Sequence, residues 1–233
     1  MRKINVLTLA MCIAVVFGCS TKQGTGALIG TGGGAIIGAI VGKLAGNTAV
    51  GAAVGGAVGA GAGAIIGKHM DKVAAQAKQI EDAKVEQVTD KNGLKAVKVT
   101  FDSGILFNTG SSTLSSSAKA SLSKFANTVL LKNTDADVSI QGYTDNQGWK
   151  NSTAEQSQQK NLALSQQRAQ SVSSYLLGCG VSNTQIKSVD GFGEANPVAD
   201  NSTKAGQEQN RRVEVYLYAS EAMINAANNG TLQ

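Results

Sequence analysis

A strand, a turn and a helix follow one another between Val138 and Arg168, and this stretch limits the possible folds most strongly. Val138–Gln141 alternates between two faces, as a strand does, and Gly142 ends it. Asp145 lies just past the strand end, and Arg168 lies in the helix after a polar run. A carboxylate and an arginine placed in this way can hold a zwitterionic ligand by two charge-assisted contacts. The alternative is a surface ion pair, which contributes little.

Further elements on both sides of this stretch predict one folded domain over residues 94–219, followed by a tail at 220–233. The predicted strands are Lys95–Phe101, Val138–Gln141, Gln185–Val189 and Arg212–Tyr218, and the predicted helices are Ala118–Val129 and Asn161–Leu177. The order β-α-β-α-β-β predicts an α+β two-layer sandwich with its helices on one face of the sheet. About 125 residues suffice for an independent core.

Three short blocks give the domain a family resemblance. They are Gly142-Tyr143-Thr144-Asp145, Asn161–Ala169 and Asn210–Glu214, with Gly191-Phe192-Gly193 and Asn196-Pro197 between the last two. In this order they resemble the signature motifs of the OmpA-like peptidoglycan-associating domain, and the resemblance covers residues 95 to 218. Asp145 and Asn161 are 16 positions apart, about twice the usual spacing in the family. The additional loop, residues 146–160, could cover or reshape the site.

The resemblance implies a ligand, the diaminopimelate of the peptidoglycan stem peptide. Carried over by block, the candidate site comprises Asp145, Arg168, Asn161, Thr144, Arg211 and Asn108. Asp145 would contact the ammonium of the ligand and Arg168 its carboxylate, through the planar guanidinium. The threonine and the helix asparagine would supply neutral hydrogen bonds. Arg211 would be a second cation or, equally, a charge that faces solvent. Asn108 stands where the family often has an aspartate, which removes one anion.

Glycines recur every four residues in two runs, at positions 26–46 and 51–67. This spacing places them along one helical face, where a second helix can approach closely. The break at Gly46-Asn47-Thr48 predicts an antiparallel helical hairpin over residues 26–68, similar to the glycine-zipper segments of small bacterial surface lipoproteins. A disordered linker is the alternative, but the intervening Ala, Ile, Val and Leu are not what a flexible linker needs. The hairpin could lie in lipid or make a homo-oligomer.

Residues 69–93 connect the hairpin to the domain. They are rich in Ala, Lys, Gln and Glu, and Val73, Ala77 and Ile80 lie on a loose helical face. The pattern predicts a helical spacer that ends at Asn92-Gly93.

The N-terminus has the features of a secretory signal at residues 1–18. Met1-Arg2-Lys3 is basic, and Val6–Phe17 is apolar but too short to span a membrane. Gly18-Cys19 resembles a bacterial lipobox, whose cysteine carries a diacylglycerol and, with further acylation such as palmitate, becomes the new N-terminus. The residue after this cysteine is Ser20 rather than aspartate, which resembles the pattern of lipoproteins that are sent to the outer membrane. We therefore expect a lipid anchor at Cys19, a short tether at 19–25, and a C-terminal domain in the periplasm.

Composition limits the possible functions. The net charge is +5, and removal of Arg2 and Lys3 leaves +3, too mild to indicate a nucleic-acid partner. His69 lies outside the predicted domain, Cys179 has no histidine partner, and no nucleophile–base or metal-ligand spacing occurs. We therefore expect no catalysis, no metal and no cofactor.

Two functions fit these features. The first is a non-catalytic outer-membrane lipoprotein that anchors the membrane to the wall by binding the peptidoglycan stem peptide. The alternative is a zipper-driven membrane pore or assembly protein in which the wall-binding domain only positions the assembly.

Overall fold

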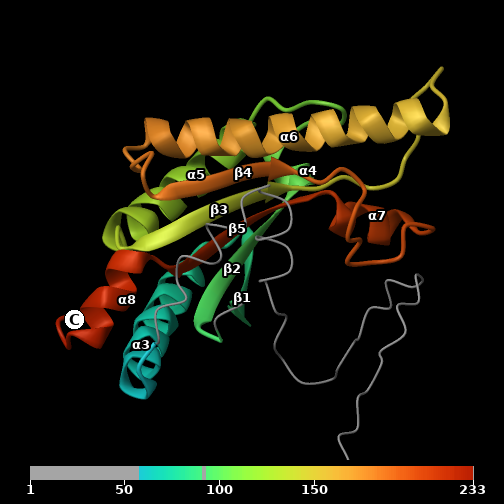
Figure 1. Ribbon diagram of the computed structural model, residues 1–233. Helices are drawn as coiled ribbons and strands as arrows, with labels where there is room; N and C mark the ends of the chain where they lie inside the picture. Colours follow the sequence, from blue (N-terminus) through green and yellow to red (C-terminus); the bar gives the residue numbers. More distant parts are fainter. Residues whose placement is uncertain (1–57, 91–92, 233) are drawn as a thin grey trace, which may run out of the picture. The chain divides into compact units, whose positions relative to one another are not determined.

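The computed structural model describes residues 58–90 and 93–232, and in them one five-stranded sheet is the central element (Figure 1). Its strands are β1 (Ala83–Thr89), β2 (Lys95–Asp102), β3 (Ala136–Gly142), β4 (Ile186–Gly191) and β5 (Arg212–Ala219). The order across the sheet is β1-β2-β5-β3-β4. Neighbouring strands are antiparallel except for β3 and β4, which are parallel.

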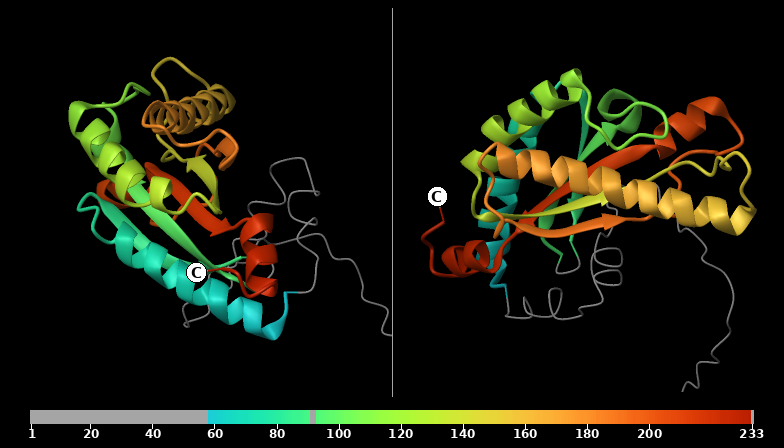
Figure 2. Two further views of the ribbon diagram at one scale, coloured as in Figure 1. Left: turned by 90° about the vertical axis from the view of Figure 1, so that its left-hand side faces the viewer. Right: turned by 90° about the horizontal axis from the view of Figure 1, so that it is seen from above.

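Three helices cover one face of this sheet, as Figure 2 shows. The helices of the described residues are α3 (Ala60–Ala77), α4 (Ser103–Leu106), α5 (Ser116–Thr128), the 3-10 turn η1 (Leu130–Lys132), α6 (Ala154–Gly178), α7 (Lys204–Asn210) and α8 (Glu221–Asn228). α3 lies over β1 and β2, α6 over β3 and β4, and α5 between them. Alternate residues of β2 and β5, such as Val99 and Val215, point into the core under these helices because side chains alternate along a strand.

The predicted α+β two-layer fold is confirmed, with all four predicted strands and both predicted helices present. Among the elements that were not predicted are β1, which extends the sheet, and α7, which lies between the last two strands. Helix α6 also begins at Ala154, seven residues before Asn161. Thr153 caps it through a capping box with Gln156, so part of the additional 146–160 segment lengthens this helix.

Helix α3 belongs to the domain core, and the predicted domain boundary at residue 94 is therefore wrong. Ile66, Met70 and Val73 are fully buried in the same cluster as the sheet and α5. The last glycines of the zipper register face the domain as well, since a Cβ on Gly67 would lie 3.6 Å from Cδ of Lys95. The rest of the predicted hairpin, the tether and the signal segment lie outside the described residues.

The helical prediction for residues 69–93 is correct as far as Ala77 and wrong for Ala83–Thr89, which pairs with β2 as the antiparallel strand β1. In the connection, Asp90 Oδ1 accepts a hydrogen bond from the Leu94 amide at 2.8 Å, and Gly93 has a φ of 77°. An Asn-Gly pair between alternating segments is a strong hairpin signal, and it outweighs the loose helical periodicity.

The predicted C-terminal tail contains helix α8, whose buried Met223 and Ile224 join the core beside α3.

His69 also lies inside the domain: its side chain is 11% exposed, and its Nε2 is 3.5 Å from Oδ1 of Asp135. The expectation that it lies outside is wrong. Cys179 is the C-cap of α6. In the described ranges, no helix has the length and apolarity needed to cross a bilayer.

Two glycines let α6 rest directly on the sheet. Gly142 of β3 and Gly191 of β4 are paired in register. A Cβ on Gly142 would overlap the carbonyl oxygen of Ser165, and one on Gly191 would overlap the amide nitrogen of Gln166. Ser165 Oγ also accepts a hydrogen bond from the Gly193 amide at 2.8 Å. These contacts fix the height and rotation of α6 on the sheet.

We expect a fragment of residues 58–233 to fold and a fragment of residues 94–233 to unfold at ambient temperature. The shorter fragment loses β1 and the buried side chains of α3. Each fully buried aliphatic side chain contributes about 1.5–3 kcal/mol, and a domain has about 5–15 kcal/mol in total. Urea unfolding followed by circular dichroism compares the two. Equal midpoints would show that α3 is dispensable.

Gly191→Ala should lower the free energy of unfolding by about 1–3 kcal/mol or more, because the methyl group forces α6 away from the sheet. Gly178→Ala is the matched control in α6 itself, since nothing lies within 4 Å of a Cβ there. The control should keep or slightly raise the stability. A Gly191→Ala protein as stable as the control would contradict the close packing.

Candidate ligand-binding site

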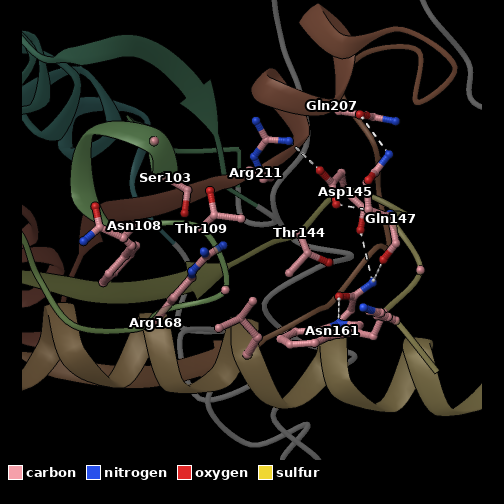
Figure 3. A pocket seen from close by; sticks show the side chains of 17 residues that line it. Ser103, Asn108, Thr109, Thr144, Asp145, Gln147, Asn161, Arg168, Gln207 and Arg211 are labelled. Carbon is pink, nitrogen blue, oxygen red and sulfur yellow. Dashed lines mark hydrogen bonds and ion pairs between the residues drawn. The ribbon is translucent and has the colours of Figure 1, made fainter. Parts of the chain in front are cut away.

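A pocket of about 540 Å³ opens where β3 ends against α6, α4 and the end of α7 (Figure 3). All six residues predicted for the site line it: Asn108, Thr144, Asp145, Asn161, Arg168 and Arg211. They come from segments far apart in the sequence. The fold therefore brings the residues that the three blocks indicated together with Asn108.

Asp145 is held at the end of β3 by its backbone neighbours and is paired with Arg211. The Thr144 amide donates to the Gly193 carbonyl at 2.8 Å, so the hydrogen bonding between the two segments continues past the ends of β3 and β4. Asp145 is 5% exposed. Its Oδ2 is 2.5 Å from Nη1 of Arg211, and its Oδ1 accepts from the Gln147 amide at 3.2 Å. Arg211 therefore belongs to the site, as the direct ionic partner of this carboxylate.

Arg168 projects from α6 into the same pocket and is 3% exposed. Its Nε donates to the Ser111 carbonyl at 3.0 Å, and its guanidinium carbon lies 5.2 Å from the centre of the Phe107 ring. Its two terminal nitrogens make no hydrogen bond within residues 58–90 and 93–232. Burial, and to a lesser extent the Arg211 charge, lower the pKa of Arg168 to about 10, while Asp145 acts in the opposite direction. The side chain therefore remains charged at neutral pH.

The side chain of Asn161 forms hydrogen bonds that hold the additional loop against the site. Its Nδ2 donates to the carbonyls of Asp145 and Gln147 at 3.4 and 3.2 Å, and its Oδ1 accepts from Nε1 of Trp149 at 2.7 Å. The Trp149 amide in turn donates to Oγ of Ser157 at 3.0 Å. Residues 147–150 thereby form one wall of the pocket. The additional loop is therefore part of the lining of the site.

The two arginines of the third block have different surroundings. Arg211 faces the pocket, whereas Arg212 is buried and donates from Nε to Oε1 of Glu214 at 2.7 Å. The Arg212 guanidinium lies 3.8 Å from the centre of the Tyr143 ring, which stacks on Phe192 at 5.2 Å. Arg212 thus supports the turn before Asp145 from behind.

Sequence reasoning missed several pocket residues, among them Ser103, Trp149 and Gln207. Ser103 and Gln207 carry no signal in the sequence, because they reach the pocket only through the packing of α4 and α7. Trp149 had a signal: it is the single tryptophan of the chain and stands in the additional loop.

The charges of the pocket suit an anionic or zwitterionic ligand. Arg168 and Arg211 contribute +2 and Asp145 contributes −1, which leaves +1. Lys150 also lines the mouth and is exposed. Within the described residues, no three His, Cys, Asp or Glu side chains gather as metal ligands would. Two guanidinium groups beside a carboxylate can bind both charged ends of an amino acid.

Comparisons with known proteins agree with this geometry. Residues 106–211 match the OmpA family, and residues 1–71 match the YMGG-like Gly-zipper. The chain is 33% identical over 158 residues to Probable lipoprotein YiaD of Escherichia coli (strain K12), which covers 65% of this chain and 64% of that protein. It is 45% identical over 83 residues to the Peptidoglycan-binding protein ArfA of Mycobacterium bovis, covering 36% of this chain and 23% of that one.

Among solved structures, the cell wall anchor of the T6SS from Pseudomonas aeruginosa has the same fold. The TM-score is 0.51 at 24% identity, over 65% of this chain and 97% of that one. Residues 106–211 of this chain are therefore similar to the OmpA family, and residues 1–71, which precede them, are similar to the YMGG-like Gly-zipper.

Proposed function

We propose that the chain is a non-catalytic lipoprotein that binds the stem peptide of peptidoglycan and so links the outer membrane to the cell wall. The observation that carries this proposal is the buried Arg168, whose terminal nitrogens are unpaired in the described residues and lie in one pocket with Asp145. The relative ArfA is named a peptidoglycan-binding protein, which supports the same ligand class.

The ligand group that this pocket fits is a diaminopimelate residue with a free ammonium and a free carboxylate. The planar guanidinium of Arg168 would bind the carboxylate through two parallel hydrogen bonds. Asp145 would accept from the ammonium with the lone pairs that Arg211 and Gln147 leave free. Arg211, the ionic partner of Asp145, would be a second cation beside the ligand. Because the Asn161 amide already serves the 145–149 backbone and Trp149, we infer that it chiefly positions this loop.

Attachment to the membrane is the second part of the proposal. The lipobox-like Gly18-Cys19 supports acylation of Cys19, and the relative YiaD is named a lipoprotein. Ser20 supports the outer membrane as destination, with the domain in the periplasm. Stable attachment needs more than one membrane-binding element. We propose that the several acyl chains are one such element. The glycine-rich segment would add to them, either by contact with lipid or by self-association.

Asp145→Ala and Arg168→Ala should each nearly abolish sedimentation of the detergent-solubilised full chain with purified sacculi. Losing one partner of a buried, hydrogen-bonded charge pair costs about 2–5 kcal/mol, against about 0–1 kcal/mol for an exposed pair. Arg168→Lys should fail in large part, because an ammonium cannot reproduce the bidentate geometry.

Lys187→Ala is the matched control for these variants. It removes a cation of β4 that pairs with Asp137 outside the pocket, so sacculus binding should not change. Circular dichroism must show that each variant is folded. Folded Asp145→Ala and Arg168→Ala chains that bind within about threefold of the unaltered chain, on the order of 0.7 kcal/mol, would refute the site.

Cys19→Ala should leave an uncleaved, unacylated precursor. Mass spectrometry of the protein from a cell envelope preparation would show the signal segment still attached and no lipid mass. Ser20→Ala, which keeps the cysteine, should still be acylated. An unchanged mass and unchanged fractionation of Cys19→Ala would exclude the lipid anchor.

A further inference from the structure

Two buried hydroxyl groups in the pocket have no hydrogen-bond partner among the residues that the structure describes. Ser103 is 1% exposed and Thr144 is 4% exposed, and both line the pocket. Within the described part of the chain, Oγ of Ser103 and Oγ1 of Thr144 form no hydrogen bond. Buried polar atoms are nearly always paired, and an unpaired one destabilises the fold. A ligand group that accepts a hydrogen bond from each hydroxyl would give both of them a partner.

Backbone hydrogen bonds, rather than their own hydroxyls, hold both residues in place. The Ser103 amide donates to the Arg211 carbonyl at 2.9 Å, and the Ser103 carbonyl accepts from the Phe107 amide at 2.8 Å. The Thr144 amide donates to Gly193. The hydroxyls are therefore preorganised but unused. Figure 3 shows Ser103, Thr144 and Arg168 around the same hollow, with Arg211 beside Ser103 and Asp145 beyond it.

The chemistry of this end of the pocket is that of hydrogen-bond donors. A guanidinium has donors only, and a hydroxyl can always donate. The acceptor that satisfies several converging donors is a carboxylate, which offers about four lone-pair sites. An ammonium would be repelled by Arg168, and the NH₂ of a carboxamide would find no acceptor on the guanidinium.

We propose that the Ser103 hydroxyl, together with that of Thr144, receives the carboxylate that Arg168 holds, and that this subsite selects a diamino acid with a second, free carboxylate over lysine. The inference rests on the proposed function and adds Ser103 as a ligand-binding residue. It also divides the ligand between the two ends of the pocket, because the Ser103 end takes the carboxylate and the Asp145 end takes the ammonium.

The test is competition with sacculus binding by the detergent-solubilised full chain. The competitors are two peptides that differ at one internal residue, meso-diaminopimelate or L-lysine, so that only the first presents a free carboxylate beside its side-chain ammonium. The unaltered chain should prefer meso-diaminopimelate. Ser103→Ala and Thr144→Val should each reduce this preference about tenfold or more, because each removes a hydrogen bond to a charged group. Ser173→Ala, at a buried serine of α6 outside the pocket, should leave the preference unchanged.

Thermal unfolding separates a ligand contact from a structural role. Ser103→Ala removes an unpaired buried hydroxyl, so the midpoint should stay the same or rise while the preference for meso-diaminopimelate falls. A preference within about threefold of the unaltered chain in both hydroxyl variants would overturn the proposal, as would an equal loss of lysine competition. If Arg168→Ala abolishes sacculus binding in the same assay, the proposed function stands even then. If Arg168→Ala binds normally, the proposed function itself fails.

Discussion

The contact between the backbone of α6 and the ends of β3 and β4 is the constraint on which the site depends. Gly142 and Gly191 lie next to each other in register, and no side chain fits between them and the helix. Because the helix backbone touches the strand backbone, α6 cannot rotate or lift without losing this contact. Asn161 and Arg168 lie on the same helix, so their positions over the strand ends follow from two missing Cβ atoms. Ser165, which accepts from the Gly193 amide, locks the helix in the same place.

The chain enters the domain through a helix that is itself part of the core. Ile66 and Met70 of α3 pack with the sheet and α5, so the segment nearest the glycine-rich region cannot move independently of the domain. This differs from an anchor and a domain joined by an independent spacer. A force applied to the chain before α3 would act on the packing of α3 against β1 and β2, which buries apolar side chains.

The pocket combines a rigid frame with unsatisfied groups. Behind it, Arg212, Glu214 and Tyr216 form a buried hydrogen-bonded chain, and the Arg212 guanidinium lies on the Tyr143 ring. Burial, followed by the charge of Glu214, raises the pKa of Tyr216 far above its ordinary value. In front, Arg168 is buried with unpaired terminal nitrogens in the described residues, beside two unpaired hydroxyls. Buried charges and hydroxyls without partners destabilise a fold, so these groups cost the free protein stability.

Much of this protein follows from local sequence patterns. Alternation along β2 and β5, the apolar stripe of α5 and the turn glycines depend on neighbouring residues, and they determined the α+β layers in advance. The three blocks likewise indicated five of the six residues of the candidate site, and the turn at Asn108 indicated the sixth, because each of these is a short local motif. The partners of these residues depend on distant parts of the chain. The pairing of Asp145 with Arg211, the wall formed by Trp149 and the place of Ser103 arise only when α4, α6 and α7 pack against one sheet edge. The same holds for β1, whose residues were predicted as helix and became a strand through pairing with β2. For α3 the helix was predicted, but its place in the core was decided by packing against the sheet and α5.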